Sequence, residues 1–356
     1  MNNENKSLKK TIEKLILSSN KVFIVGHNEP DFDAIGSAIG LQVLATSLLR
    51  KAYIVVDDVE LEPGVKKIVD ENKNRYNIIN KKQYEELRTD NMLLIMTDVN
   101  KDYMISLGDR LADFKKVLII DHHKEDEHTV DTKYKFIDLK TSSACETVTK
   151  LLTTYKQPLI NINTANFLLS GIILDTKSFR KATSTETLQA AKHLIKKGAT
   201  IDYVEDLFLR EFEEDKKINN LVFGNTAFRT FTSGLVQNKN IAFTLNREAP
   251  DTIYKREDLA KAADKVMRYK VDAAFAIGYV KDNLLSVSAR SKSDIDVSDI
   301  LTSIEGIQSG GNPNSAGAKV EGMDIYDLEK LIVEKATEYL ENTHDDPFVL
   351  KKTRKL

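Results

Sequence analysis

The sequence predicts an α/β protein in which a parallel-sheet domain is joined by a helical linker to a smaller α+β domain. In the first half, short β-branched runs alternate with helical patterns, as they do in parallel sheets with crossover helices. After about residue 217, closely spaced strand-like runs replace this alternation. The length of 356 residues suits roughly two domains of about 150 residues each.

The strands of the first domain are expected at four short apolar runs, residues 22–25, 53–56, 92–96 and 117–120. Apolar spacing predicts a helix from Ala34 to about Arg50, and a polar helical stretch is expected at 102–114. Ser143 and Glu146 are spaced as a capping box, with Ser143 as the N-cap of the next helix and Glu146 reaching back to it.

The second half begins with a charged helical region over residues 185–217 that has no obvious strand partner. Strands are then expected at 234–236, 241–244, 273–280 and 284–289, and helices near 256–269 and 325–341. We therefore place a first domain at 18–195, a helical linker at 196–225 and a second domain at 226–343. Residues 343–356 are expected to form a tail outside the second domain.

Composition excludes several classes of protein. The 52 basic and 54 acidic side chains leave a formal charge of −2, which argues against coating of DNA or another large nucleic acid. The single Cys145 cannot form an internal disulfide and is expected to be a packed side chain. We find no membrane span and no signal peptide, so the cytoplasm is the expected location. The glycine motifs of dinucleotide-binding and P-loop proteins are also missing.

Acidic and histidine residues cluster where the apolar runs end. His27, Asp31 and Asp33 follow the first strand, and the other clusters are Asp98, the triplet Asp121, His122 and His123, and Asp175. Ligands of open parallel sheets bind beyond the carboxyl ends of the strands, so these clusters should become neighbours. Carboxylates with one or two imidazoles suit Mn²⁺, Mg²⁺ or Fe²⁺ better than structural zinc.

Two of these segments resemble the motifs of the DHH phosphoesterase superfamily, namely the triplet at residues 121–123 and the run from His27 through Asp31 and Asp33 to Ser37. Residues 286–290 and 310–318 resemble the DHH-associated C-terminal domain. The flanks at 171–179 and 288–291 are most similar to the catalytic half of GdpP-type cyclic-di-AMP phosphodiesterases. Those proteins usually carry membrane helices and further domains upstream, and we do not expect membrane attachment here.

The resemblance implies a centre of two divalent metal ions, Mn²⁺ in most members. One ion would be held by His27, Asp31 and Asp98. The other would be held by Asp33, Asp98, His122 and Asp175, so that Asp98 bridges the two ions. His123 would face the scissile phosphate as a hydrogen-bond donor or general acid, which makes His123 and Asp98 the expected catalytic residues.

The second domain is implied to bind the nucleotide through Arg290, Ser288, Gly310, Gly311 and Asn312. An arginine can bind a phosphate through two parallel hydrogen bonds, and the glycines allow a ligand to approach the backbone. In the family, the motif at the equivalent position reads Gly-Gly-Gly-His, whereas this chain has Ser309, Gly310, Gly311 and Asn312. Asn312 cannot carry a positive charge, so substrate affinity or choice could differ from the family's.

The expected function is manganese-dependent hydrolysis of cyclic di-AMP to 5′-pApA by metal-activated hydroxide. Two alternatives stay open: a short-oligonucleotide hydrolase or pAp phosphatase, and an inactive nucleotide-binding regulator suggested by Ser309 and Asn312. The expected partner is a small cyclic or linear dinucleotide, with no membrane and no large nucleic acid, and a homodimer is left open. Relative kcat/KM for cyclic and linear dinucleotides would separate the two enzymes.

Overall fold

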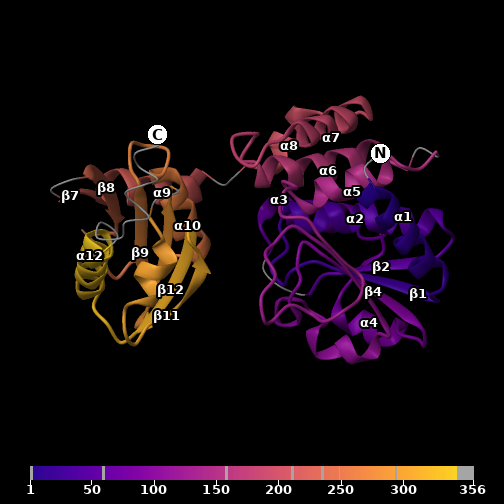
Figure 1. The fold of residues 1–356 in the computed structure, drawn as a ribbon, viewed down its shortest axis with the longest axis horizontal. Helices are drawn as coiled ribbons and strands as arrows, with labels where there is room; N and C mark the ends of the chain where they lie inside the picture. Colours follow the sequence, from indigo (N-terminus) through magenta and orange to yellow (C-terminus); the bar gives the residue numbers. More distant parts are fainter. Residues whose placement is uncertain are drawn as a thin grey trace. The chain divides into compact units, whose positions relative to one another are not determined.

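A computed structural model describes residues 3–57, 61–156, 159–209, 212–233, 236–247, 249–292 and 295–342. The chain folds into two compact units, Met1–Leu209 and Arg210–Leu356, which are described separately below (Figure 1). This division falls inside the linker predicted at 196–225, and the predicted domain boundaries themselves stay a proposal.

The first unit is built on a six-stranded parallel sheet of order β3-β2-β1-β4-β5-β6. Its strands are β1 (Lys21–Val25), β2 (Lys51–Val55), β3 (Ile78–Ile79), β4 (Met92–Thr97), β5 (Lys116–Asp121) and β6 (Lys135–Ile137). Every residue of β4 is buried, as expected for a central strand covered on both faces. The predicted parallel sheet is therefore confirmed.

Helices cover both faces of this sheet, and α1, α2, α5 and α6 lie on the face opposite α4 (Figure 1). They are α1 (Asn3–Leu17), α2 (Phe32–Ser47), α3 (Pro63–Asn72), α4 (Lys81–Leu87), α5 (Ala144–Leu152), α6 (Ile162–Asp175), α7 (Thr185–Lys196) and α8 (Ile201–Leu207). Helices α2 and α6 pack closely, because a Cβ on Gly36 would lie 2.4 Å from the carbonyl oxygen of Phe167.

Three details of the sequence prediction are wrong in this unit. The stretch 102–114 forms two short 3₁₀ helices, η1 (Asp102–Met104) and η2 (Gly108–Asp113), instead of one helix. The short strands β3 and β6 were not expected, because two or three residues carry too little periodicity to be recognised. Asp175 ends helix α6 and does not follow a strand.

The start of α5 confirms only half of the predicted capping box. The Ser143 hydroxyl accepts the Glu146 amide at 3.0 Å. The Glu146 carboxylate, however, bonds the amide and hydroxyl of Ser142, at 3.0 and 2.6 Å, rather than the Ser143 amide. It also accepts from the Thr187 hydroxyl at 2.8 Å and pairs with Lys150. This buried carboxylate therefore ties α5 to its preceding loop and to α7.

Replacing Glu146 with glutamine is expected to lower the free energy of unfolding at pH 7 by about 1–3 kcal/mol, because a charge-assisted network is lost. Burial raises the pKa of Glu146, but Lys150, Ser142 and Thr187 outweigh it and hold the pKa below its usual 4.5. The stabilisation is complete above that value and disappears as the pH falls through the lower folded-state pKa. Urea unfolding should therefore show a gap between wild type and variant that narrows below pH 4.5; a gap independent of pH would contradict this.

The second unit contains a mixed sheet of order β11-β12-β10-β9-β8-β7, in which only β8 and β9 pair in parallel. Its strands are β7 (Thr226–Ser233), β8 (Val236–Thr244), β9 (Ala273–Lys281), β10 (Leu284–Ser291), β11 (Gln308–Asn312) and β12 (Ser315–Glu321). Its helices are α9 (Phe212–Asn225), α10 (Arg256–Val266), α11 (Val297–Thr302) and α12 (Ile325–Asn342). The predicted α+β class is confirmed.

The helical region predicted at 185–217 is divided into α7, α8 and the start of α9. Strands β11 and β12 were not predicted, because their glycine-rich sequence looks like a loop. Residues 234–235 of one predicted strand, and the tail at 343–356, lie outside the described residues. Among the helices that the structure describes, none is both long and apolar enough to cross a membrane.

Candidate metal centre

The sheet topology brings three of the sequence clusters to one edge. His27 follows β1, Asp98 follows β4 and His122 follows β5, and these three strands are neighbours in the sheet. Because all three run parallel, their carboxyl ends lie at the same edge. Asp175 reaches the same place from the end of α6, which packs on α2. The predicted gathering of these residues is present in the structure.

The first group of donor atoms comes from His27, Asp31 and Asp98, with one atom from each within 4.8 Å of the others. The Nε2 atom of His27 lies 3.8 Å from Oδ1 of Asp31 and 3.6 Å from Oδ2 of Asp98. The group thus offers one imidazole nitrogen and two carboxylate oxygens.

The second group comes from Asp33, His122 and Asp175, again within 4.8 Å. The Nε2 atom of His122 lies 3.7 Å from Oδ2 of Asp33 and 3.2 Å from Oδ2 of Asp175. It also lies 3.2 Å from Oδ1 of Asp98, whose other oxygen faces His27. Asp98 therefore stands between the two groups and presents one carboxylate oxygen to each.

Backbone amides hold the two carboxylates of the first loop in different directions. Asp31 is the N-cap of α2, and its Oδ1 accepts the amides of Asp33 and Ala34 at 2.8 and 3.0 Å. The fully buried Asp33 accepts the amides of Ala144 and Cys145 at 2.7 and 2.8 Å, at the start of α5. Two carboxylates that are two residues apart can thus face two different donor groups.

The backbone of Asp98 has an unusual conformation. Its φ is +59°, in the left-handed region that aspartate, asparagine and glycine enter more readily than other residues. Its amide donates to the carbonyl of Ile120 on the neighbouring strand β5 at 3.1 Å. The turn directs a 4% exposed side chain into the space between His27 and His122.

The buried carboxylates repel one another. Burial raises the pKa of Asp33 to about 7, and the charge of Asp175 adds to this shift. Burial, followed by the charge of Asp33, raises the pKa of Asp98 well above its usual range. Burial lowers the pKa of His122, but its hydrogen bonds to Asp175 and Asp98 outweigh this and raise it to about 11. The centre carries the concentrated negative charge that a divalent cation neutralises.

His123 also lies near Asp98, with 3.6 Å between its Nδ1 and Oδ1 of Asp98, but a different carboxylate holds it more closely. Its Nδ1 lies 2.8 Å from Oδ1 of Asp121, a carboxylate that also accepts the amides of His122 and His123. The other oxygen of Asp121 accepts a hydrogen bond from the buried Asn100 at 2.8 Å. Asp121 and Asn100 therefore orient His123, whose side chain is 57% exposed. Sequence reasoning gave no role to Asn100, and nothing in its local sequence indicates one.

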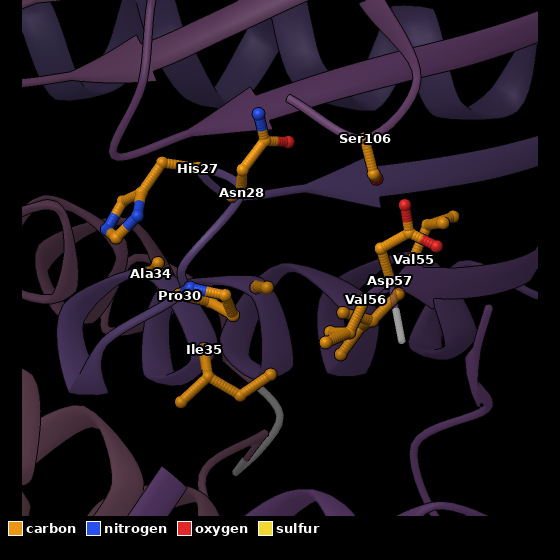
Figure 2. A pocket seen from close by; sticks show the side chains of 12 residues that line it. His27, Asn28, Pro30, Ala34, Ile35, Val55, Val56, Asp57 and Ser106 are labelled. Carbon is orange, nitrogen blue, oxygen red and sulfur yellow. The ribbon is translucent and has the colours of Figure 1, made fainter. Parts of the chain in front are cut away.

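A small pocket adjoins the centre at the ends of β1 and β2. Figure 2 shows His27 at one side of it and Asp57 and Ser106 at the other, with Pro30 and Ile35 nearby. His27 thus borders this pocket as well as the donor group. Cys145 is fully buried with its sulfur 3.4 Å from the carbonyl of Asp33, so the prediction of a packed cysteine is confirmed.

The predicted substrate-binding residues all lie in the second unit. Arg290, Ser288 and Gly310 line one pocket of about 500 Å³. Gly311 and Asn312 follow on β11 but are not among its lining residues. Gly311 has a φ of +141° and lies against Ser315 and Ala316, so its place in the strand requires glycine. Arg290 pairs with Asp264 at 3.1 Å.

The chain thus combines a parallel sheet that carries a histidine and aspartate centre suited to divalent metal with a second, mixed-sheet domain. Residues 21–172 match the DHH family, N-terminal domain, and residues 238–342 match the DHHA1 domain. The chain belongs to the DHH family of metal-dependent phosphoesterases.

Curated relatives agree with this assignment. The chain is 28% identical to the cyclic-di-AMP phosphodiesterase GdpP of Bacillus subtilis over 93% of its own length and 49% of the relative's. It is 29% identical to the cyclic-di-AMP phosphodiesterase PdeA of Listeria monocytogenes, over 92% and 49%. It is 27% identical to the bifunctional oligoribonuclease and PAP phosphatase NrnA of Mycoplasma genitalium, over 84% and 88%. The chain thus spans about half the length of the first two.

Solved structures support the fold. An exopolyphosphatase-related protein from Bacteroides fragilis matches with a TM-score of 0.76 and 19% identity, over 94% of this chain and 96% of that one. RecJ from Thermus thermophilus, solved with Mn²⁺, matches with a TM-score of 0.51 and 13% identity, over 95% and 55%. The fold of the chain is therefore one already seen in solved structures.

Proposed function

We propose that the chain is a manganese-dependent phosphodiesterase that hydrolyses cyclic di-AMP to 5′-pApA. The observation that carries this proposal is Asp98, which presents one carboxylate oxygen to each of two groups of His and Asp donors. The similarity to two cyclic-di-AMP phosphodiesterases over more than nine-tenths of the chain supports the choice of substrate.

The donor set fits two divalent cations. His27, Asp31 and Asp98 would hold one, and Asp33, Asp98, His122 and Asp175 would hold the other. Bound there, such ions supply Lewis acidity, a water of lowered pKa and neutralisation of phosphate charge. Oxygen-rich donors with one imidazole in each group suit Mn²⁺ or Mg²⁺.

The chain itself supplies orientation and proton transfer. The carboxylate of Asp121 accepts a hydrogen bond from Nδ1 of His123, which fixes the ring, and Nε2 has no hydrogen-bond partner among the described residues. In its protonated form, His123 can donate from Nε2 to a phosphate oxygen or to the leaving oxygen. This is the role proposed for it, with Asp121 and Asn100 as positioning residues.

The alternative is a short-oligonucleotide hydrolase or pAp phosphatase. It is supported by the similarity to NrnA and by Asn312, which is exposed on β11 and bonds the amide of Asn314. The same metal centre would serve either reaction, so the choice depends on how the second unit binds nucleotide.

Product analysis separates these functions. Purified protein with Mn²⁺ is offered cyclic di-AMP, cyclic di-GMP, pApA and pAp in parallel, and products are resolved by anion-exchange chromatography. Accumulation of pApA from cyclic di-AMP is the expected result. Rapid hydrolysis of pApA, with the cyclic compounds untouched, would move the protein to the alternative. No turnover of any compound, with nucleotide still bound, would overturn both in favour of a binding regulator.

A further inference from the structure

The pocket in the second unit lies on one face of the β10-β12-β11 portion of the sheet. Along β12, Ser315, Gly317 and Lys319 are half-buried on this face, whereas Ala316, Ala318 and Val320 are buried on the other. The pocket is closed at one side by α10, which packs on β9 and β10 and contributes Arg256 and Ala260.

Strand pairing places the side chains of this face in three rows across the sheet. One end row is Arg290, Ser315 and Asn312, the middle row is Ser288, Gly317 and Gly310, and the other end row is Ser286, Lys319 and Gln308. At about 3.4 Å per residue, the end rows are about 14 Å apart along β12. This distance leaves room for a ligand larger than one phosphate group.

The middle row has little side-chain bulk. A Cβ on Gly310 would meet nothing within 4 Å, and one on Gly317 would meet only the carbonyl oxygen of Val287, at 3.4 Å. These two glycines pair directly across β11 and β12. A nucleoside can therefore lie against the backbone here, between the two end rows.

The charges that line the pocket are all positive. Arg256, Arg290 and Lys319 line it, and none of its described lining residues is Asp or Glu. Arg290 has Asp264 as a partner, whereas neither Arg256 nor Lys319 forms an ion pair with another described residue. The pocket thus has one cation in each end row of the sheet and a third on the helix beside it.

Arg256 begins α10, and Asp264 near the other end of that helix pairs with Arg290, so Arg256 lies at the helix end away from Arg290. We propose that Lys319 and Arg256 form a second phosphate subsite, which binds the phosphate group of the substrate that is not cleaved. Arg290 lies at the opposite end of the pocket, and the nucleoside occupies the glycine row between them. This inference rests on the proposed function and refines its substrate class to dinucleotides that carry two phosphate groups. It predicts that loss of the second phosphate weakens binding of the dinucleotide only in a chain that retains Lys319.

The test is binding of pApA and of ApA, which lacks the 5′-phosphate, to the full chain in EDTA, where nothing is hydrolysed. We expect the wild type to bind pApA about tenfold more tightly than ApA, and Lys319→Ala to weaken pApA about tenfold but ApA less than twofold. Arg256→Ala should also weaken binding of pApA more than binding of ApA. Lys319→Arg, which keeps the positive charge, should retain the preference for pApA over ApA. Lys281→Ala, which removes an exposed cation at the end of β9, is the matched control and should change neither the affinity for pApA nor the affinity for ApA.

The subsite would be refuted if Lys319→Ala lost affinity for pApA and ApA equally. It would also be refuted if the preference for pApA over ApA disappeared only in Arg290→Ala. Circular dichroism of each variant excludes unfolding as the cause. Because binding is measured without metal, this result is independent of the proposed hydrolysis. A protein with the phosphate preference but no turnover in Mn²⁺ would retain the subsite and lose the proposed function.

Discussion

Replacing Asp98 with asparagine is expected to reduce Mn²⁺-dependent turnover on the order of 10³-fold or more, because one side chain serves both donor groups. Asparagine also tolerates the left-handed backbone at this position, so the change tests the carboxylate and not the turn. Isothermal titration should show that the variant no longer binds two Mn²⁺ ions with the affinity of the wild type.

Stability provides a readout without substrate. Mn²⁺ at 100 times its Kd should stabilise the wild type by about 2.7 kcal/mol, and the variant should lose most of this gain. Without metal, the variant should be no less stable than the wild type, because the repulsion between Asp98 and Asp33 is removed. The exposed Asp90→Asn, in the loop before β4, is the control. Undiminished turnover in Asp98→Asn would refute the shared-carboxylate mechanism.

Replacing Gly171 with alanine is expected to destabilise the first unit by about 1–3 kcal/mol and to lower metal affinity. Glycine to alanine inside a helix usually stabilises by about 0.5–1 kcal/mol, so the expected sign is reversed. The reason is the contact between α6 and the centre: the new methyl would lie 2.5 Å from the Cys145 sulfur and 2.8 Å from both Cα and Oδ1 of Asp33. Urea unfolding measures the first effect and Mn²⁺ titration the second.

Gly224→Ala in α9 is the matched control, since its methyl group would meet nothing within 4 Å. It should be neutral or slightly stabilising and should leave Mn²⁺ binding unchanged. Similar effects of the two substitutions would show that crowding at Asp33 is not the cause.

The first sheet was predictable because its central strands are continuous apolar runs, such as residues 92–96, which have few alternatives to burial. The meeting of His27, Asp98 and His122 followed from parallel topology alone. Asp175 was identified as a candidate because it ends an apolar run, but that run forms helix α6, which packs on α2, and not a strand of the sheet.

Other features depend on contacts that local sequence does not encode. Glu146 has the spacing of a capping box, but tertiary contacts with Ser142 and Thr187 determine where its carboxylate points. Asn100 lies near Asp98 in sequence and acts on Asp121, which only the fold brings close. The glycine-rich strand β12 is stabilised by pairing with β10, and β11 by pairing with β12, which no propensity of their own would suggest.

The carboxylate of Asp33 is held by two backbone amides at the start of α5, and Asp31 is held by the amides of α2. These bonds do not need an ion, so the chain can fold before the centre is filled, and metal adds stability to a fold that is already present. A metal-free chain should stay folded and should regain activity as soon as Mn²⁺ is added, without a refolding delay. The metal concentration would then switch the activity of protein that is already folded on and off. After a period of metal depletion, activity would return without new protein synthesis.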